Sequence, residues 1–180
     1  MHWSQDLKIP KKEKRVTLWI HPEGRVCGSL FLSLQNRYYS GAEEPLEVLN
    51  HEEPFLAFKR DGTDEPRFYN KTCIMRVEYP GEGQRHPEET TRLWCRLHLT
   101  DGSEIEGAIN KVLPPDHSRL YDFLNMDTER FTELSTTEGA VCLVNKAYVV
   151  SATSLSDAHH VSHDGHAWQP GELAADQSIF

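Results

Sequence analysis

Short segments in which every second residue is apolar recur along the chain, and this period of two predicts β-strands. The clearest are residues 16–20 and 95–99, in which one apolar row would face a core while the other residues face outward. Glu23-Gly24 and Asp101-Gly102 follow these segments, and glycine accepts the positive φ that tight hairpins require. The pattern predicts a mainly β protein made of short strands.

The same pattern occurs twice, which indicates an internal repeat. Residues 15–20 align with residues 94–99 at an offset of 79, and this offset also places Gly28 on Gly107. Two further matches follow at an offset of 75, Leu49-Asn50 with Leu124-Asn125 and Asn70-Lys71 with Asn145-Lys146. The constant order and spacing predict two copies of one module.

We expect the modules at residues 15–79 and 93–155, joined by a linker at 80–92 that is rich in proline, glycine and charge. Each module should hold five short strands in a small barrel or strongly bent sheet. The segment 119–125 predicts a short helix or turn. Gly28 and Gly107 interrupt predicted strands and indicate a bulge or sharp bend. Two such modules are expected to pack as a pseudo-twofold pair.

The ends of the chain differ from its middle in charge. The 180 residues carry 19 Lys and Arg against 28 Asp and Glu, a net charge of −9, which disfavours binding of polyanions over the whole surface. Residues 1–14 form an N-terminal arm in which the basic residues of the chain are locally concentrated. Residues 156–180 are acidic and poor in apolar residues, so we expect a disordered tail.

Enzyme signatures and a metal centre are not evident. The chain has no GxSxG, HExxH, P-loop or dinucleotide motif, and Asp116-His117 with Tyr121 fits a surface loop better than an acid–base pair. The tail histidines could meet a metal only if that segment were helical, and Gly165 and Pro170 oppose a helix. We therefore predict a protein without enzymatic activity, cofactor or metal; the histidines are His159, His160, His163 and His166.

The cysteines favour a reducing compartment. The four cysteines lie at least 22 residues apart, so no CxxC pair exists for zinc or redox chemistry, and three of them lie in apolar runs, as buried free thiols do. No secretory signal or membrane span is visible. A cytoplasmic location is expected.

Two segments of the second module carry a resemblance to a known family. Residues 97–107, with the Asp101-Gly102 turn and Gly107, resemble the first motif of Sm-like proteins, and residues 141–150 are similar to the closing motif of bacterial Hfq-type Sm barrels. The first module matches more loosely, and the whole pattern also resembles an uncharacterised group of bacterial proteins. The resemblance implies small barrels that assemble through edge strands, and so a possible homo-oligomer.

The resemblance also implies a site. Hfq-type barrels bind RNA with a Lys-His pair in the loop of the closing motif, where this chain has Asn70-Lys71 and Asn145-Lys146. These pairs could contact RNA, together with the basic arm, or could simply form tight turns, because asparagine tolerates positive φ.

Aromatic residues suggest a different partner. Trp19 and Trp94 are expected opposite the apolar rows, and exposed aromatics are typical anchors of protein interfaces; they could equally form the seam between the modules. The predicted function is a non-enzymatic bacterial adaptor or regulator that binds a protein partner, with RNA binding as the alternative. The candidate partner-binding residues are Trp19, Phe31, Tyr38, Tyr39 and Trp94.

Overall fold

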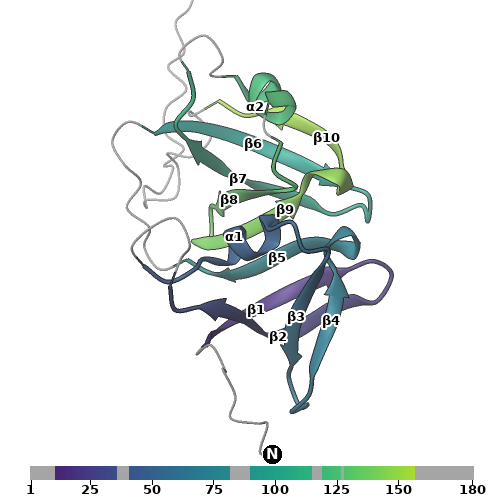
Figure 1. Cartoon of the computed structure of the whole chain (residues 1–180). Helices are drawn as coiled ribbons and strands as arrows, with labels where there is room; N and C mark the ends of the chain where they lie inside the picture. Colours follow the sequence, from purple (N-terminus) through teal and green to yellow (C-terminus); the bar gives the residue numbers. More distant parts are fainter. Residues whose placement is uncertain (1–10, 36–40, 82–89, 115–118, 127, 157–180) are drawn as a thin grey trace, which may run out of the picture.

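A computed structural model describes residues 11–35, 41–81, 90–114, 119–126 and 128–156. This part of the chain contains ten strands, two α-helices and two single-turn 3-10 helices (Figure 1). In chain order they are β1 (Lys11–Ile20), β2 (Gly24–Ser33), α1 (Pro45–Asn50), β3 (Phe55–Arg60), β4 (Pro66–Asn70), η1 (Lys71–Cys73), β5 (Ile74–Pro80), β6 (Thr91–Leu99), β7 (Glu104–Lys111), α2 (Leu120–Met126), β8 (Phe131–Thr136), β9 (Ala140–Asn145), η3 (Lys146–Tyr148) and β10 (Val149–Ser154). The prediction of a mainly β protein is confirmed.

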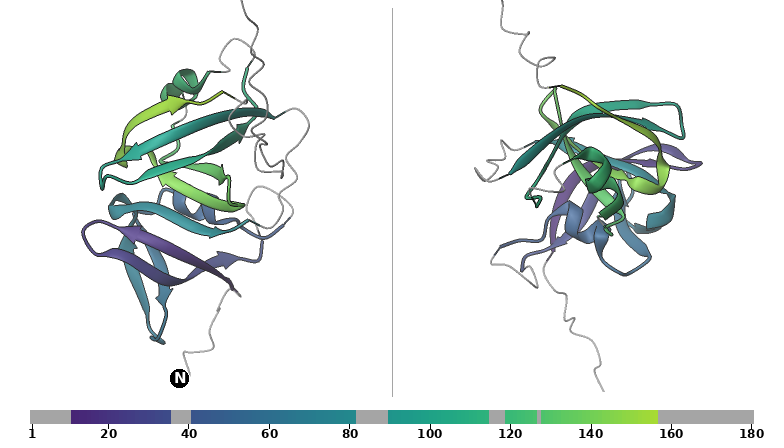
Figure 2. Two further views of the ribbon diagram at one scale, coloured as in Figure 1. Left: turned by 180° about the vertical axis from the view of Figure 1, so that it is seen from behind. Right: turned by 90° about the horizontal axis from the view of Figure 1, so that it is seen from above.

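All ten strands belong to one antiparallel sheet with the order β10-β6-β7-β8-β9-β5-β1-β2-β3-β4. The first half of the chain contributes the run β5-β1-β2-β3-β4, and the second half contributes β10-β6-β7-β8-β9. Within each half, the five strands therefore follow the same order, so β10 corresponds to β5 and β9 corresponds to β4. Figure 2 shows the two halves stacked on each other, with the blue and purple strands on one side and the green and yellow strands on the other.

The junction between the halves corrects the expected pseudo-twofold relation. A twofold pair would join a strand to its own counterpart, whereas here β5 pairs with β9, whose counterparts are β10 and β4. The pairing runs over five residue pairs, from Arg76 opposite Val144 to Pro80 opposite Ala140. The halves are therefore joined head to tail, because antiparallel pairing of unlike edges lets one sheet continue into the next.

Two apolar cores lie on the two sides of this junction. Leu18 and Leu97, which were predicted to occupy equivalent inward positions, are both fully buried. The first core also takes in Phe131, Val141 and Leu143 from the second half, while the second core is built from its own half. The core of the first half is therefore completed by side chains of the second.

Gly28 and Gly107 do not mark bulges. Both lie in strands with continuous pairing, and neither has a positive φ. A Cβ built on Gly28 would lie 2.1 Å from the carbonyl oxygen of Lys59, and one on Gly107 would lie 2.7 Å from that of Ser135. Glycine is required because the third strand of each half approaches the second too closely for a side chain.

Several boundaries differ from the sequence prediction. β1 begins at Lys11 rather than at residue 15, because the polar residues 11–14 also pair with the end of β2. Helix α2 was predicted, but α1 was not, since its six residues contain Pro45 and no full helical period.

Tyr38, Tyr39, most of the linker and the histidine tail lie outside the described residues. Within the described ranges, no helix is long and apolar enough to cross a membrane.

We predict that alanine at Gly28 or Gly107 destabilises the protein through this close approach. Each added methyl group meets a backbone carbonyl that cannot move without breaking the sheet, and overpacking of this kind costs about 1–3 kcal/mol. Chemical denaturation should show the loss for both variants, with the larger effect at Gly28. Ser29→Ala, on the adjacent half-exposed position, is the control and should change stability by less than about 0.5 kcal/mol.

Candidate functional site

Asn145 is the best-buried polar residue at the junction of the two halves. It ends β9 with no exposed surface, and its Nδ2 donates to the carbonyl oxygen of Ile74 at 2.9 Å and to that of Lys71 at 3.4 Å. Its Oδ1 accepts from the backbone N–H of Ala147 at 3.1 Å. One side chain thus ties the end of the second half to the start of β5.

Asn50 makes a second tie between the halves from the opposite direction. It ends α1, and its Nδ2 donates to the carbonyl oxygen of Phe131 at 3.0 Å while its Oδ1 accepts from the N–H of Phe131 at 2.8 Å. The two bonds satisfy both outward backbone groups at the start of β8, which would otherwise be left at the edge of the ladder. The helix of the first half therefore covers the second half.

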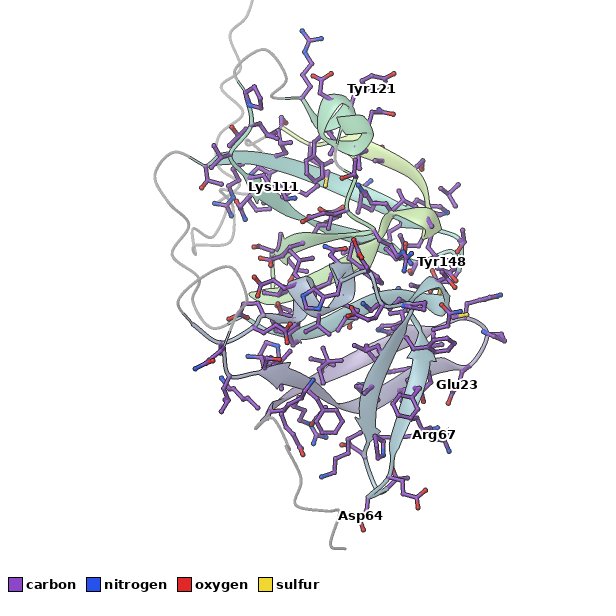
Figure 3. All side chains as sticks on the ribbon, viewed as in Figure 1. Glu23, Asp64, Arg67, Lys111, Tyr121 and Tyr148 are labelled. Carbon is purple, nitrogen blue, oxygen red and sulfur yellow. The ribbon has the colours of Figure 1, made fainter. Side chains whose placement is uncertain are left out.

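Tyr148 adds a contact next to Asn145. Its hydroxyl donates to the carbonyl oxygen of Thr72 at 2.8 Å, and Figure 3 shows its side chain at the level where the two halves meet. The candidate RNA-binding loops are thus packed against each other through η1 and η3.

Lys71 is buried, with 1% of its surface exposed. Its Nζ donates to the carbonyl oxygen of His51 at 3.0 Å, so the side chain points into the fold below α1. Desolvation by burial lowers the pKa of Lys71, against the opposing charge of Glu53. Of the four candidate RNA-binding residues, Lys71 and Asn145 have almost no surface to offer a phosphate.

The remaining two candidates are more accessible. Asn70 and Lys146 are both partly exposed, and Asn70 accepts through Oδ1 from the N–H and the hydroxyl of Thr72 at 2.9 and 2.8 Å. Asn70 and Asn145 therefore both begin a 3-10 turn and cap it with the side chain. Both Asn-Lys pairs therefore lie at turns, as the turn-forming interpretation has it, but the expected reason is wrong: φ is −68° at Asn70 and −75° at Asn145, and each asparagine acts by capping the turn with its side chain.

Trp19 lies beside the junction. The guanidinium of Arg76 stacks over its ring at 4.1 Å, and Arg76 then reaches across to the second half, with Nη1 donating to Ser103 Oγ at 2.7 Å and to Asp101 at 3.4 Å. Burial raises the pKa of Asp101, but its hydrogen bonds from Ser103 and the charge of Arg76 outweigh this and lower it. These contacts favour the interpretation that Trp19 forms part of the seam between the two halves over the interpretation that it is an anchor for a protein partner.

Trp94 does not reach this seam. It sits on β6 opposite Ala108, and the guanidinium of Arg92 stacks over its ring at 4.4 Å. Trp94 is half-buried. The two tryptophans, which the sequence presented as a pair, therefore occupy unrelated surroundings, because the alignment places Trp94 on Arg15 and not on Trp19.

A cavity of about 700 Å³ lies on the first half, between the ends of β1 and β2, helix α1 and the start of β3. Phe31, one of the candidate anchors, lines it. The other apolar walls come from Leu34, Val48, Phe55, Leu56 and Ala57, and the ionisable groups from Lys11, Glu43, His51, Glu53 and Lys71. Sequence reasoning missed this site, since its residues come from four separate segments and share no motif.

The ionisable groups around the cavity largely satisfy one another. Glu43 accepts from the N–H of Ser33 at 2.9 Å and lies 3.4 Å from Nε2 of His51, while Lys71 is bound to the backbone of His51. The described residues contain no group of three metal-ligating side chains. The cavity therefore presents apolar walls with a polar rim that is already paired, which suits an apolar ligand.

We predict that Asn145→Ala destabilises the protein by about 2–4 kcal/mol, because it leaves the buried carbonyl of Ile74 without a partner and also removes the side-chain cap on the N–H of Ala147. Asn70→Ala is the matched control, since Asn70 makes the same local cap without the bonds across the junction, and should cost about 1 kcal/mol. Equal losses in chemical denaturation would show that Asn145 acts only as a cap.

Thiol labelling provides a test of the second core, to which Cys95 and Cys142 both belong. Burial raises the pKa of Cys95 and of Cys142 to about 12, so neither forms a reactive thiolate at neutral pH. Cys27 and Cys73 are partly exposed. N-ethylmaleimide should add to two thiols of the native protein and to all four in denaturant, as read by intact mass. Labelling of Cys95 or Cys142 without denaturant would contradict the packing described.

Comparisons with known proteins add no further constraint: no protein-family model matches the chain, and no match was found among curated proteins or solved structures.

Proposed function

We propose that this chain is a non-enzymatic adaptor, built from two Sm-like modules, that binds a protein partner through the cavity of its first half. The observation that carries the proposal is the cavity itself, in which Phe31, Leu34 and Phe55 surround about 700 Å³ of space. Leu34 and Phe55 are about half exposed. A concave apolar site with exposed aromatic walls is the usual form of a binding pocket.

The partner contributes an apolar segment to this site. Glu43, His51 and Lys71 already have hydrogen-bond or ion-pair partners within the chain, so these three groups are not expected to provide the main attraction for a partner. Affinity then comes from burying apolar surface, at roughly 25 cal/mol per Å² before the entropy of association is subtracted. A short extended peptide with one or two large apolar side chains has the chemistry that fits this cavity.

Two features support Sm-like modules. The strand order β5-β1-β2-β3-β4 recurs as β10-β6-β7-β8-β9, and each half has its Asn-capped 3-10 turn before the last strand. The RNA alternative has less support, since Lys71 and Asn145 are buried and the net charge is −9. The buried free thiols Cys95 and Cys142 support a reducing, cytoplasmic location.

Site-specific photo-crosslinking tests the proposal. A photoreactive amino acid at Leu34, at the mouth of the cavity, should yield an adduct with protein in extracts of the native organism, and that adduct should survive nuclease and disappear with protease. The same residue at Val112, which is exposed on the second half, is the control and should yield little. An adduct that disappears with nuclease would favour the RNA alternative.

A charged side chain in the cavity should abolish the interaction. Phe31→Glu places a carboxylate among apolar walls, and the cost of desolvating it opposes entry of an apolar segment. We expect crosslinking at Leu34 to fall by at least about tenfold, with an unchanged melting temperature as evidence of folding. Val112→Glu is the matched control, and undiminished crosslinking in Phe31→Glu would exclude this cavity as the binding site.

A further inference from the structure

The cavity of the first half lies on the outer face of its sheet. Strands β1, β2 and β3 turn even-numbered residues toward the first core, as the burial of Val16, Leu30 and Phe58 shows. Odd-numbered residues of these strands therefore face outward. The odd-numbered residues that line the cavity from these strands, and from the position just after β2, are Lys11, Phe31, Ser33, Gln35, Phe55 and Ala57.

The cavity borders the point where β1 begins. Lys11 is the first residue of β1 and lines the cavity, and it pairs with Ser33 at the end of β2 (Figure 1). Continuing this antiparallel register by two residues sets Ile9 opposite Gln35, which is also part of the cavity wall. Residues 1–10, which lie outside the described residues, are therefore attached to the chain at the cavity itself.

The sequence before Lys11 continues the alternation of β1. Within residues 3–9, the row that shares the face of Lys11 contains only uncharged residues, and three of its four members are apolar: Trp3, Gln5, Leu7 and Ile9. The two charged residues of this segment, Asp6 and Lys8, fall in the opposite row. A residue that precedes proline is restricted to extended backbone, so Pro10 is compatible with this alternation.

The uncharged row matches the chemistry of the cavity. Leu34 and Phe55 form apolar walls and are 49% and 54% exposed. Glu43, His51 and Lys71 have partners within the chain. A charge that faced these walls would lose its hydration without a new partner, whereas apolar side chains gain by leaving water. The cavity therefore favours the row of Leu7 and Ile9 over the row of Asp6 and Lys8.

The segment also has the right reach. An extended chain advances about 3.3 Å per residue, so Ile9 lies within about 7 Å of Lys11 and Leu7 within about 13 Å. The volume of about 700 Å³ is typical of sites that enclose a drug-sized ligand. Because so short a tether gives an effective concentration on the order of millimolar, even a weak contact is occupied in most molecules.

We infer that residues 3–9 occupy the cavity of their own chain, with Leu7 and Ile9 against its apolar walls, and compete there with the protein partner. The inference rests on the proposed function only for the partner that is excluded. A partner then binds only the fraction of molecules in which the segment is released, so occupancy of about nine molecules in ten weakens its apparent affinity about tenfold.

Photo-crosslinking from within the segment tests the contact directly. A photoreactive amino acid at Ile9 of the full chain should form a link to peptides that contain Val48 or Phe55, as read by mass spectrometry after proteolysis. The same amino acid at Lys8 is the matched control and should give at least about fivefold less, because adjacent residues face opposite sides. Equal yields at the two positions would overturn the inference. So would a yield that falls on dilution, since that link would join two molecules.

Dye binding measures whether the segment covers the apolar walls. Ile9→Asp in the full chain should increase the fluorescence of anilinonaphthalene sulfonate by about threefold or more, because this dye reports exposed apolar surface. Lys8→Asp introduces the same carboxylate in the opposite row and should leave the fluorescence unchanged. Adding Phe31→Glu to Ile9→Asp should remove the increase, which locates the dye in the cavity. Equal fluorescence of wild type and Ile9→Asp would contradict the inference.

A synthetic peptide provides the complementary measurement. The peptide of residues 1–10 should displace the dye from the Ile9→Asp chain, and a peptide with aspartate at positions 7 and 9 should not. Displacement by both peptides, or by neither, would count against binding through the apolar row.

Partner crosslinking at Leu34 separates this inference from the proposed function. Ile9→Asp should increase the protein adduct severalfold over wild type. If the dye and peptide results hold but neither chain forms a protein adduct, the proposed function fails and occupation of the cavity by residues 3–9 stands. If both chains form the adduct equally and the dye does not respond, the inference fails and the proposed function stands.

Discussion

The pairing of β5 with β9 is the interaction on which the rest of the structure depends. It converts two five-stranded sheets into one ten-stranded sheet, and it brings Phe131, Val141 and Leu143 into the core of the first half. A module of about 65 residues buries only about 60% of its potential surface. Sharing apolar side chains across the junction increases that fraction without lengthening either module.

Two asparagines give this junction its orientation. Asn145 reaches from the second half into η1 of the first, and Asn50 reaches from the first half to β8 of the second. Each satisfies backbone groups that point out of its partner's ladder, and buried amide hydrogen bonds are lost if the register shifts. The apolar side chains supply most of the stabilisation, while the asparagines select one register.

The head-to-tail geometry also explains why the two halves present different surfaces. Phe55 pairs with Asn70 as Phe131 pairs with Asn145, so the two phenylalanines are equivalent. Phe131 is bound by Asn50 of α1 and is fully buried, whereas Phe55 has no preceding half to cover it and remains half exposed beside the cavity. Two repeats joined through one pair of unlike edges leave the other edge of each repeat at an end of the sheet, here β10 and β4. The candidate protein-binding cavity and the open edges are thus consequences of the same junction.

The sequence by itself determined the elements and their repetition. Alternation of apolar residues located the first strands of both halves, with Leu18 and Leu97 facing inward. The spacing of the Leu-Asn and Asn-Lys pairs identified equivalent positions in the two halves, and the structure places these positions near helix ends and at turns. These features depend on neighbours within a few residues, where side-chain chemistry and backbone geometry are directly linked.

Only the tertiary structure decided how the halves meet and what each polar residue does. Lys71 and Lys146 occupy equivalent positions in the sequence, yet one is buried and the other partly exposed. Gly28 is required because β3 lies against it, and the cavity combines Phe31 with residues of α1 and β3. Burial and pairing of this kind arise between segments far apart in the chain, so they depend on which strand edges come together rather than on any local pattern.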